Sequence, residues 1–320
     1  MSTIAERRPI ITAEQIIESA QKLAGVSGKK MVAVAGASDS AVLGALCSAS
    51  ADGILTATLF GDKEKILKAA HEAKVDISNF DIVHDNDVNK STCGAVKMAA
   101  EGSADVIMKG FVSTSSLLKT VLSKDFDLKI SETVSHSAVL DIPGHHKLLQ
   151  MTDGGMVVKP DIDQKIQIMQ NAVLVARALN INPVRVALSA AVDRVHDDDP
   201  QSKECQAVLD RVASMNLKDI LVAGPMTFDT ATSKEVAEMK DIDNPVAGEA
   251  DIYLVSTIEE CNIIAKSLIN FADTIFAGVI VGARVPVSLV SRTDTVINKK
   301  ASVSVACLVA EYYKTRGGAA

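Results

Sequence analysis

The stretch MVAVAGASDSAVLGALCSA, residues 31–49, carries the pattern that decides the fold. An apolar run ends at Gly36, and an apolar stretch with helical spacing follows it. The same unit recurs, and the runs expected to be strands lie at residues 31–35, 54–60, 106–108, 184–188, 220–223, 252–255 and 274–281. These runs are apolar throughout and do not alternate, which is typical of strands buried on both faces of a parallel sheet.

Amphipathic stretches between these runs predict helices. They lie at residues 40–49, 64–73, 115–123, 164–179, 205–215 and 259–269. A further helix is expected to begin after the N-cap Thr12 and to end at Gly25. Because strands and helices alternate, the sequence predicts an α/β fold with doubly wound parallel sheets.

One segment departs from this alternation. Residues 137–142 and 148–152 are apolar runs separated only by Pro143-Gly144-His145-His146-Lys147. A gap this short cannot hold a helix, so the two runs are predicted to pair antiparallel. The length of 320 residues suggests two domains. The break in the alternation of strands and helices indicates where the chain passes from one domain to the other.

Composition excludes several classes of protein. The chain has 33 basic and 40 acidic residues, a net charge of −7, 3% aromatic residues and no Trp, so general nucleic-acid binding is not expected. The five Cys are scattered and form no C-x-x-C, which predicts reduced thiols in the cytoplasm. We find no secretory h-region and no apolar run approaching about 18 residues, so neither export nor membrane insertion is expected.

The segment that follows residues 106–108 is a candidate anion site. Ligands of open α/β sheets bind beyond the carboxyl ends of the strands, and Lys109 and Gly110 lie at such an end. Ser113 and Thr114 fall where a helix should begin, and Lys119 follows about one turn later. This arrangement predicts a cradle for an oxyanion or a phosphate, with a plain Ser N-cap and solvated lysines as the alternative.

A second candidate follows residues 274–281. The cationic Arg284 is followed by the dipeptide Ser291-Arg292, and a guanidinium beside hydroxyl groups suits a phosphoryl group. Between residues 284 and 300 the local charge is +3, from Arg284, Arg292, Lys299, Lys300 and Asp294. The alternative is an ordinary surface patch. Gly224-Pro225 marks a third junction, for which a simple turn is the alternative.

Other chemistry has no motif in this sequence. Neither G-x-G-x-x-G after a strand nor G-x-x-x-x-G-K-[ST] is present, which argues against a dinucleotide-binding site and a P-loop ATP site. No G-x-S-x-G elbow occurs, and no two His lie four residues apart beside a Glu. We therefore predict no metal site.

Taken together, these junctions resemble the phosphate acetyl/butyryltransferase family, and more closely its short butyryl-type members. The matching stretches run over roughly two thirds of the chain, and they are Met108-Lys109-Gly110, Ser135-His136, Pro143-Gly144, Thr152-Asp153 to Pro160-Asp161, Gly224-Pro225 with Asp229, Val246-Ala247-Gly248 with Asp251, Ile258-Glu259 with Asn262, Val281-Gly282-Ala283 and Ser291-Arg292.

The resemblance implies the architecture and the site. It implies two α/β domains of the isocitrate/isopropylmalate dehydrogenase type around a cleft, with residues 1–140 and 299–320 in the first and 141–298 in the second. Ser291 and Arg292 would hold the phosphate. Lys119 stands where acetyl-type members carry Arg, and Asn298 stands where they carry the Asp proposed as base. Asp294 is the nearest carboxylate and is taken as the third catalytic residue. The predicted substrate-binding set is Lys109, Ser113, Thr114, Lys119, Gly224, Pro225 and Arg284.

The function implied is transfer of an acetyl or butyryl group between coenzyme A and inorganic phosphate in a cytoplasmic homodimer. We predict direct attack of the thiol in a ternary complex, with coenzyme A as substrate and no tightly bound cofactor. Two alternatives remain open at this stage. One is a metal- and NAD(P)-dependent 2-hydroxy acid dehydrogenase of similar fold, and the other is a non-catalytic protein that binds coenzyme A or acyl phosphate.

Overall fold

The computed structural model describes residues 8–215 and 217–315. The chain forms two compact units: unit 1 is Met1–Thr12 with Thr133–Thr274, and unit 2 is Ala13–Glu132 with Ile275–Ala320. These borders differ from the predicted ones at 140/141 and 298/299. The hairpin strand that begins at Ser135 pairs with its partner inside unit 1, and the strand from Ile275 pairs inside unit 2.

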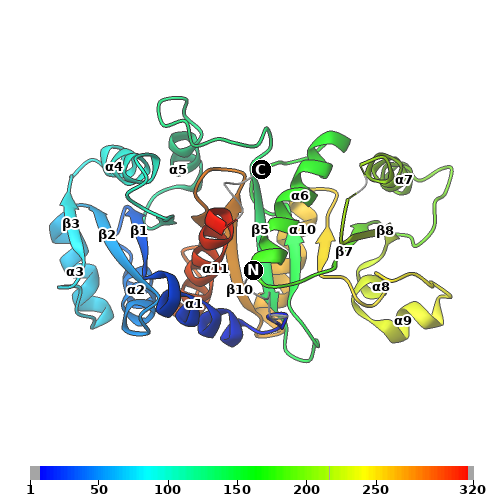
Figure 1. Cartoon of the computed structure of the whole chain (residues 1–320), viewed down its shortest axis with the longest axis horizontal. Helices are drawn as coiled ribbons and strands as arrows, with labels where there is room; N and C mark the ends of the chain where they lie inside the picture. The colour runs from blue at the N-terminus through cyan, green and yellow to red at the C-terminus, as the bar shows by residue number, and fades with distance from the viewer. Residues whose placement is uncertain (1–7, 216, 316–320) are drawn as a thin grey trace, which may run out of the picture. The chain divides into compact units, whose positions relative to one another are not determined.

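Unit 2 is built on a mainly parallel sheet (Figure 1). Its strands run in the order β3-β2-β1-β4-β11-β10, and only β10 and β11 pair antiparallel. The strands are β1 (Lys30–Ala35), β2 (Leu55–Gly61), β3 (Asp81–His84), β4 (Val106–Lys109), β10 (Ile275–Val281) and β11 (Val287–Ser288). The helices are α1 (Ala13–Ser27), α2 (Ser40–Ala51), α3 (Lys63–Ala73), α4 (Val88–Ala100), α5 (Thr114–Val121) and α11 (Val296–Thr315).

Aspartate N-caps start three successive helices of unit 2. Asp39, Asp62 and Asp87 follow β1, β2 and β3, and each side chain accepts a backbone N–H from the first turn of α2, α3 or α4. Such a cap replaces one of the hydrogen bonds that a helix cannot make internally. The caps thus fix where the loops leave the carboxyl ends of the parallel strands, which is the edge that carries the candidate site.

The helix α11 closes unit 2. It packs along β10 and also contacts α1 and α2, as Figure 1 shows for the red helix. Most of its side chains from Asn298 to Ala310 are buried, so its apolar residues form part of the core rather than one stripe. The first turn of α11, which holds Lys299, is therefore fixed against the sheet.

Unit 1 has the same kind of architecture. Its strands run in the order β5-β6-β9-β7-β8, with only β5 and β6 antiparallel. The strands are β5 (Ser135–Asp141), β6 (Leu149–Thr152), β7 (Val184–Ser189), β8 (Ile220–Met226) and β9 (Ile252–Leu254). The helices are α6 (Ile162–Ala178), α7 (Pro200–Ala213), α8 (Phe228–Thr232), α9 (Lys234–Met239) and α10 (Ile258–Phe271). A buried apolar cluster from α6, α7, β7 and β9 forms its core.

The predicted fold class and the antiparallel hairpin are confirmed. The first helix was predicted too short, because it continues through Gly25 to Ser27, and Gly28 follows with a left-handed φ of 84°. Asp199 caps α7, and Pro200 lies in its first turn. Within the described ranges no helix is long and apolar enough to cross a membrane.

Substitution of Gly110 tests how tightly the loops after β1 and β4 are packed in unit 2. A Cβ at Gly110 would lie 2.2 Å from the carbonyl oxygen of Gly36, whereas a Cβ at Gly25, exposed on α1, would meet nothing within 4 Å. We expect Gly110→Ala to lower the free energy of unfolding by about 1–3 kcal/mol. Gly25→Ala should raise it by up to about 1 kcal/mol, because alanine favours the helix. Urea unfolding measures both, and equal effects of the two changes would contradict this packing.

Candidate functional site

Lys109 ends β4 with its side chain almost wholly buried. The residue is 5% exposed, and its Nζ lies 3.4 Å from the carbonyl oxygen of Gly110. The next residues run against the loop that follows β1: Gly110 N–H donates to Ala35 O at 2.9 Å, and Phe111 N–H donates to Gly36 O at 2.5 Å. The close approach at Gly110 leaves no space for a side chain, so the two loops form one rigid edge.

The second part of the site is the loop between β11 and α11. The backbone N–H of Ser291 donates to the carboxylate of Asp294 at 2.6 Å. Lys299, which is wholly buried, donates from Nζ to the carbonyl oxygen of Ser291, also at 2.6 Å. The guanidinium carbon of Arg292 lies 4.8 Å from the centre of the Phe111 ring. This cation–π contact joins the loop to the segment after β4.

The positive charges of this region influence one another. Burial lowers the pKa of Lys109, and the charges of Arg292 and Lys299 lower it further, while Asp39 and Asp294 oppose the shift. We call Lys109, Arg292 and Lys299 the cationic cluster. Against the two carboxylates its net charge is +1. Like charges gathered together, two of them on buried lysines, favour binding of an anion, which would relieve their repulsion.

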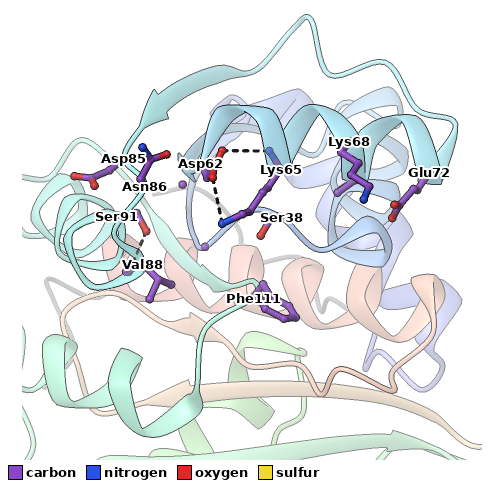
Figure 2. A pocket seen from close by; sticks show the side chains of 13 residues that line it. Ser38, Asp62, Lys65, Lys68, Glu72, Asp85, Asn86, Val88, Ser91 and Phe111 are labelled. Carbon is purple, nitrogen blue, oxygen red and sulfur yellow. Dashed lines mark hydrogen bonds and ion pairs between the residues drawn. The ribbon is translucent and has the colours of Figure 1, made fainter.

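A pocket of about 530 Å³ lies beside the cluster in unit 2 (Figure 2). The Phe111 side chain, on which Arg292 stacks, forms part of its wall. Two lysines and three carboxylates line it, giving a net charge of −1, and these are Lys65, Lys68, Asp62, Glu72 and Asp85. Lys65 is already paired with Asp62 at 3.2 Å, as Figure 2 shows. The cationic cluster is thus the better place for a phosphate than this pocket.

The basic patch of the sequence is divided by the fold. Arg284 donates to Phe126 O at 3.1 Å and lies 3.9 Å from Asp127. Lys300 reaches α2, where it contacts Asp52 at 2.6 Å. Burial and the charges of Arg292 and Lys299 lower the pKa of Lys109. Lys299 and Lys300 differ in their contacts because successive positions on α11 point in different directions.

The hydroxyl residues after β4 have a local structural role. Ser113 is the N-cap of α5 and accepts the N–H of Ser116 at 3.1 Å, which was the alternative interpretation of this segment. Thr114 is the first residue of the helix, and Lys119 is exposed in its last turn. Within residues 8–215 and 217–315 these residues make no hydrogen bond or ion pair with the cluster, so their substrate role stays a prediction.

Gly224 and Pro225 lie at the end of β8 in unit 1. A Cβ at Gly224 would lie 2.7 Å from Cβ of Leu188 on β7. Close packing of β8 on β7 thus accounts for the glycine, and binding of a substrate here stays a prediction.

Asn298 points away from the candidate site. It is 4% exposed, and its side-chain oxygen lies 3.4 Å from the backbone N–H of Phe276, at the start of β10. Asn298 therefore helps to attach α11 to the sheet, and an amide cannot accept a proton at neutral pH.

Sequence reasoning did not assign Lys299 or Phe111 to the site. Lys299 was visible only as one member of the +3 patch, and nothing in its spacing separates it from the neighbouring Lys300. Phe111 was passed over within the Gly-Ser-Thr segment. A half-exposed aromatic among glycine and hydroxyl residues is the available signal.

The buried cysteines are poor nucleophiles. Burial raises the pKa of Cys205 to about 11, and it raises the pKa of Cys261 and of Cys307 to about 12. The thiolate is the reactive form, so these side chains stay protonated at neutral pH. Among residues 8–215 and 217–315, no group of three or more His, Cys, Asp or Glu side chains is arranged to hold a metal ion.

The fold and site define an α/β protein with a cationic cluster at the carboxyl ends of parallel strands. Comparison with known proteins shows which family within this class the chain belongs to. The family model described as phosphate acetyl/butaryl transferase matches residues 85–307. The chain belongs to this family.

Its relatives carry names of that kind. The phosphate butyryltransferase of Clostridium acetobutylicum is 37% identical over 263 residues, 82% of this chain and 87% of the relative. The phosphate acetyltransferase of Rhizobium meliloti is 34% identical over 262 residues, 82% and 83% of the two chains. A crystal structure of a branched-chain phosphotransacylase from Enterococcus faecalis V583 has a TM-score of 0.79 and 30% identity, covering 88% of this chain and 99% of that one.

The lowered pKa of Lys109 predicts a pH-dependent change in stability. The folded state binds this proton less tightly than the unfolded chain, so the charged lysine destabilises the protein below its ordinary pKa of 10.5. Lys109→Met should therefore raise the free energy of unfolding at pH 7, and the gain should shrink as the pH approaches 10. Urea unfolding of both proteins at pH 7 and pH 10 measures this difference. A difference in the free energy of unfolding that favours the variant more at pH 10 than at pH 7 would contradict the prediction.

Proposed function

We propose that this protein transfers a short acyl group between coenzyme A and inorganic phosphate: acyl-CoA + phosphate gives acyl phosphate + CoA. The cationic cluster beside Ser291 and Arg292 is the observation that supports the proposal most. It offers the planar guanidinium fork and the positive field that a phosphate needs. Family membership and the names of the relatives point to the same reaction.

We propose that Ser291 and Arg292 bind the phosphate end of the acyl phosphate and stabilise it as leaving group. The buried Lys109, at the end of β4, adds positive charge to this site. Substrate binding by the other predicted residues is part of the same proposal. Holding the two substrates together can supply about 7–11 kcal/mol of the barrier, and electrostatic stabilisation of the leaving phosphate several more. Forming a thiolate from a thiol with a pKa of about 8.5 costs only about 2 kcal/mol at pH 7. Positioning and charge should therefore contribute more than a base.

The same proposal includes a cytoplasmic homodimer with coenzyme A as substrate and no tightly bound cofactor. The dehydrogenase and sensor alternatives gain no support, because the relatives are named as acyltransferases and the dinucleotide fingerprint is absent from the sequence. The choice between acetyl and butyryl stays open, since each methylene changes a transfer energy by only about 0.8 kcal/mol.

Arg292→Ala tests the phosphate site. Release of thiol from acetyl-, propionyl- and butyryl-CoA in the presence of phosphate measures the reaction. We expect the variant to lose at least about 2 kcal/mol of transition-state stabilisation, roughly 30-fold in kcat/KM. Arg211→Ala removes an exposed arginine of α7 in unit 1 and serves as the matched control. Rates near wild type for Arg292→Ala would exclude this site.

Direct transfer predicts that the protein itself is never acylated. The raised pKa values of the buried cysteines disfavour a thioester intermediate. After incubation with acyl phosphate alone, we expect the intact mass of the protein to stay unchanged. A stable increase of one acyl group, mapped to a cysteine by peptide mass analysis, would show a covalent mechanism instead.

A further inference from the structure

We infer that Asp294 and Lys299 are positioning residues that clamp the backbone of Ser291 from both sides, and that Asp294 is not the base for the thiol. The inference rests on the proposed function, because it concerns how the phosphate-binding dipeptide is held. It changes the predicted role of Asp294 and gives a role to Lys299, which sequence reasoning left outside the site.

The geometry of Ser291 supports the clamp. Its N–H donates to the Asp294 carboxylate at 2.6 Å, and its carbonyl oxygen accepts from Lys299 Nζ at 2.6 Å. The same carbonyl oxygen lies 3.3 Å from the backbone N–H of Asp294. Both polar groups of the Ser291 backbone are thus engaged by charged side chains. Hydrogen bonds to charged groups are the stronger ones, so this residue is fixed in place.

Burial separates Lys299 from the ligand-binding residues, whereas Asp294 is half-buried. Lys299 is wholly buried in α11, whereas Ser291 and Arg292 are exposed. A buried ammonium group is costly unless it is hydrogen-bonded, and Lys299 donates to the carbonyl oxygen of Ser291 in the loop. The lysine therefore anchors the loop to the rigid helix, while the loop presents its hydroxyl and guanidinium groups outward.

The observed contact of Asp294 is with the backbone of the loop, which is the contact that a positioning role requires. A general base needs a lone pair aimed at the proton that it removes. One carboxylate oxygen of Asp294 accepts the backbone N–H of Ser291, a hydrogen bond that an asparagine oxygen could also accept, though without the charge. An amide cannot take a proton, so exchanging Asp294 for Asn separates the two roles.

The main experiment compares Asp294→Asn with Asp294→Ala in the reaction of acyl-CoA with phosphate. For a clamp, Asp294→Asn should keep kcat/KM within about tenfold of wild type. Asp294→Ala, which frees the loop, should lose about 100-fold, mainly as a higher KM for phosphate. Equal losses in the two variants, with kcat rather than KM reduced, would assign Asp294 as the base. Asp81→Asn, at the exposed start of β3 in unit 2, is the matched control.

A double-variant cycle tests whether Lys299 acts on the same peptide. Lys299→Met should raise the KM for phosphate about tenfold or more. The double change Lys299→Met with Asp294→Ala should cost at most about threefold more than the worse single change, because either one already frees the loop. Multiplying effects would overturn the shared clamp. Circular dichroism identifies any variant that fails to fold. If Asp294→Ala or Lys299→Met does not fold, the kcat/KM of Asp294→Asn relative to wild type decides between the clamp and the base.

Phosphate binding separates this inference from the proposed function. If the wild type transfers no acyl group from any of the three thioesters, the proposed function fails. Titration calorimetry with inorganic phosphate alone still tests the clamp. The clamp predicts that wild type and Asp294→Asn bind phosphate with similar affinity and that Asp294→Ala binds it at least tenfold more weakly. Equal affinity in all three proteins would overturn the clamp even if acyl transfer is observed.

Discussion

Repulsion among Lys109, Arg292 and Lys299 is the physical constraint on which the site depends. Two of these side chains are almost wholly buried, and the charges of Arg292 and Lys299 help to lower the pKa of Lys109. Such a cluster opposes folding, since each ammonium gives up hydration without a full complement of carboxylates. The surrounding packing holds these charges together, and under the proposed function an arriving oxyanion would convert part of their repulsion into binding energy.

The rigidity has identifiable sources. The loop after β4 runs so close to the loop after β1 that Gly110 has no space for a Cβ. The first turn of α11 is fixed by the buried Asn298 at β10 and holds Lys299 under the Ser291 carbonyl. Arg292 then stacks on Phe111 and joins these two parts of unit 2. Packing and hydrogen bonds thus place the charges before any ligand arrives, so little conformational entropy is lost on binding.

Much of the fold was predictable because it depends on local patterns. Uniformly apolar runs identified the parallel strands, and the five-residue gap at 143–147 identified the antiparallel hairpin. The short strands β3 and β11 were missed: β3 is largely exposed and β11 has two residues, so neither forms an apolar run. The borders of the two compact units, at Thr133 and Ile275, differ from the predicted domain borders, because compact units are defined by contacts between segments far apart in the chain.

The candidate site was predictable only in part. Ser291, Arg292 and Lys109 could be selected from residue type and strand ends, but Arg284 turns to the loop at 126–127 and Lys300 turns to α2. Lys299 and Lys300 are adjacent in sequence, and only the helix position decides which one faces the loop. Asp294 was recognised as the relevant carboxylate, and its contact with the Ser291 N–H emerged only from the coordinates.

The most direct measurement is the titration of Lys109 in protein carrying ¹³C-labelled lysine, followed at Cε by NMR with and without inorganic phosphate. Lys109→Arg identifies its signal. The account predicts a midpoint for Lys109 below that of the exposed lysines in phosphate-free buffer, and a rise of that midpoint when phosphate is added. A midpoint unmoved by saturating phosphate would mean that no oxyanion binds at the cationic cluster, and the assignment of the site would be wrong.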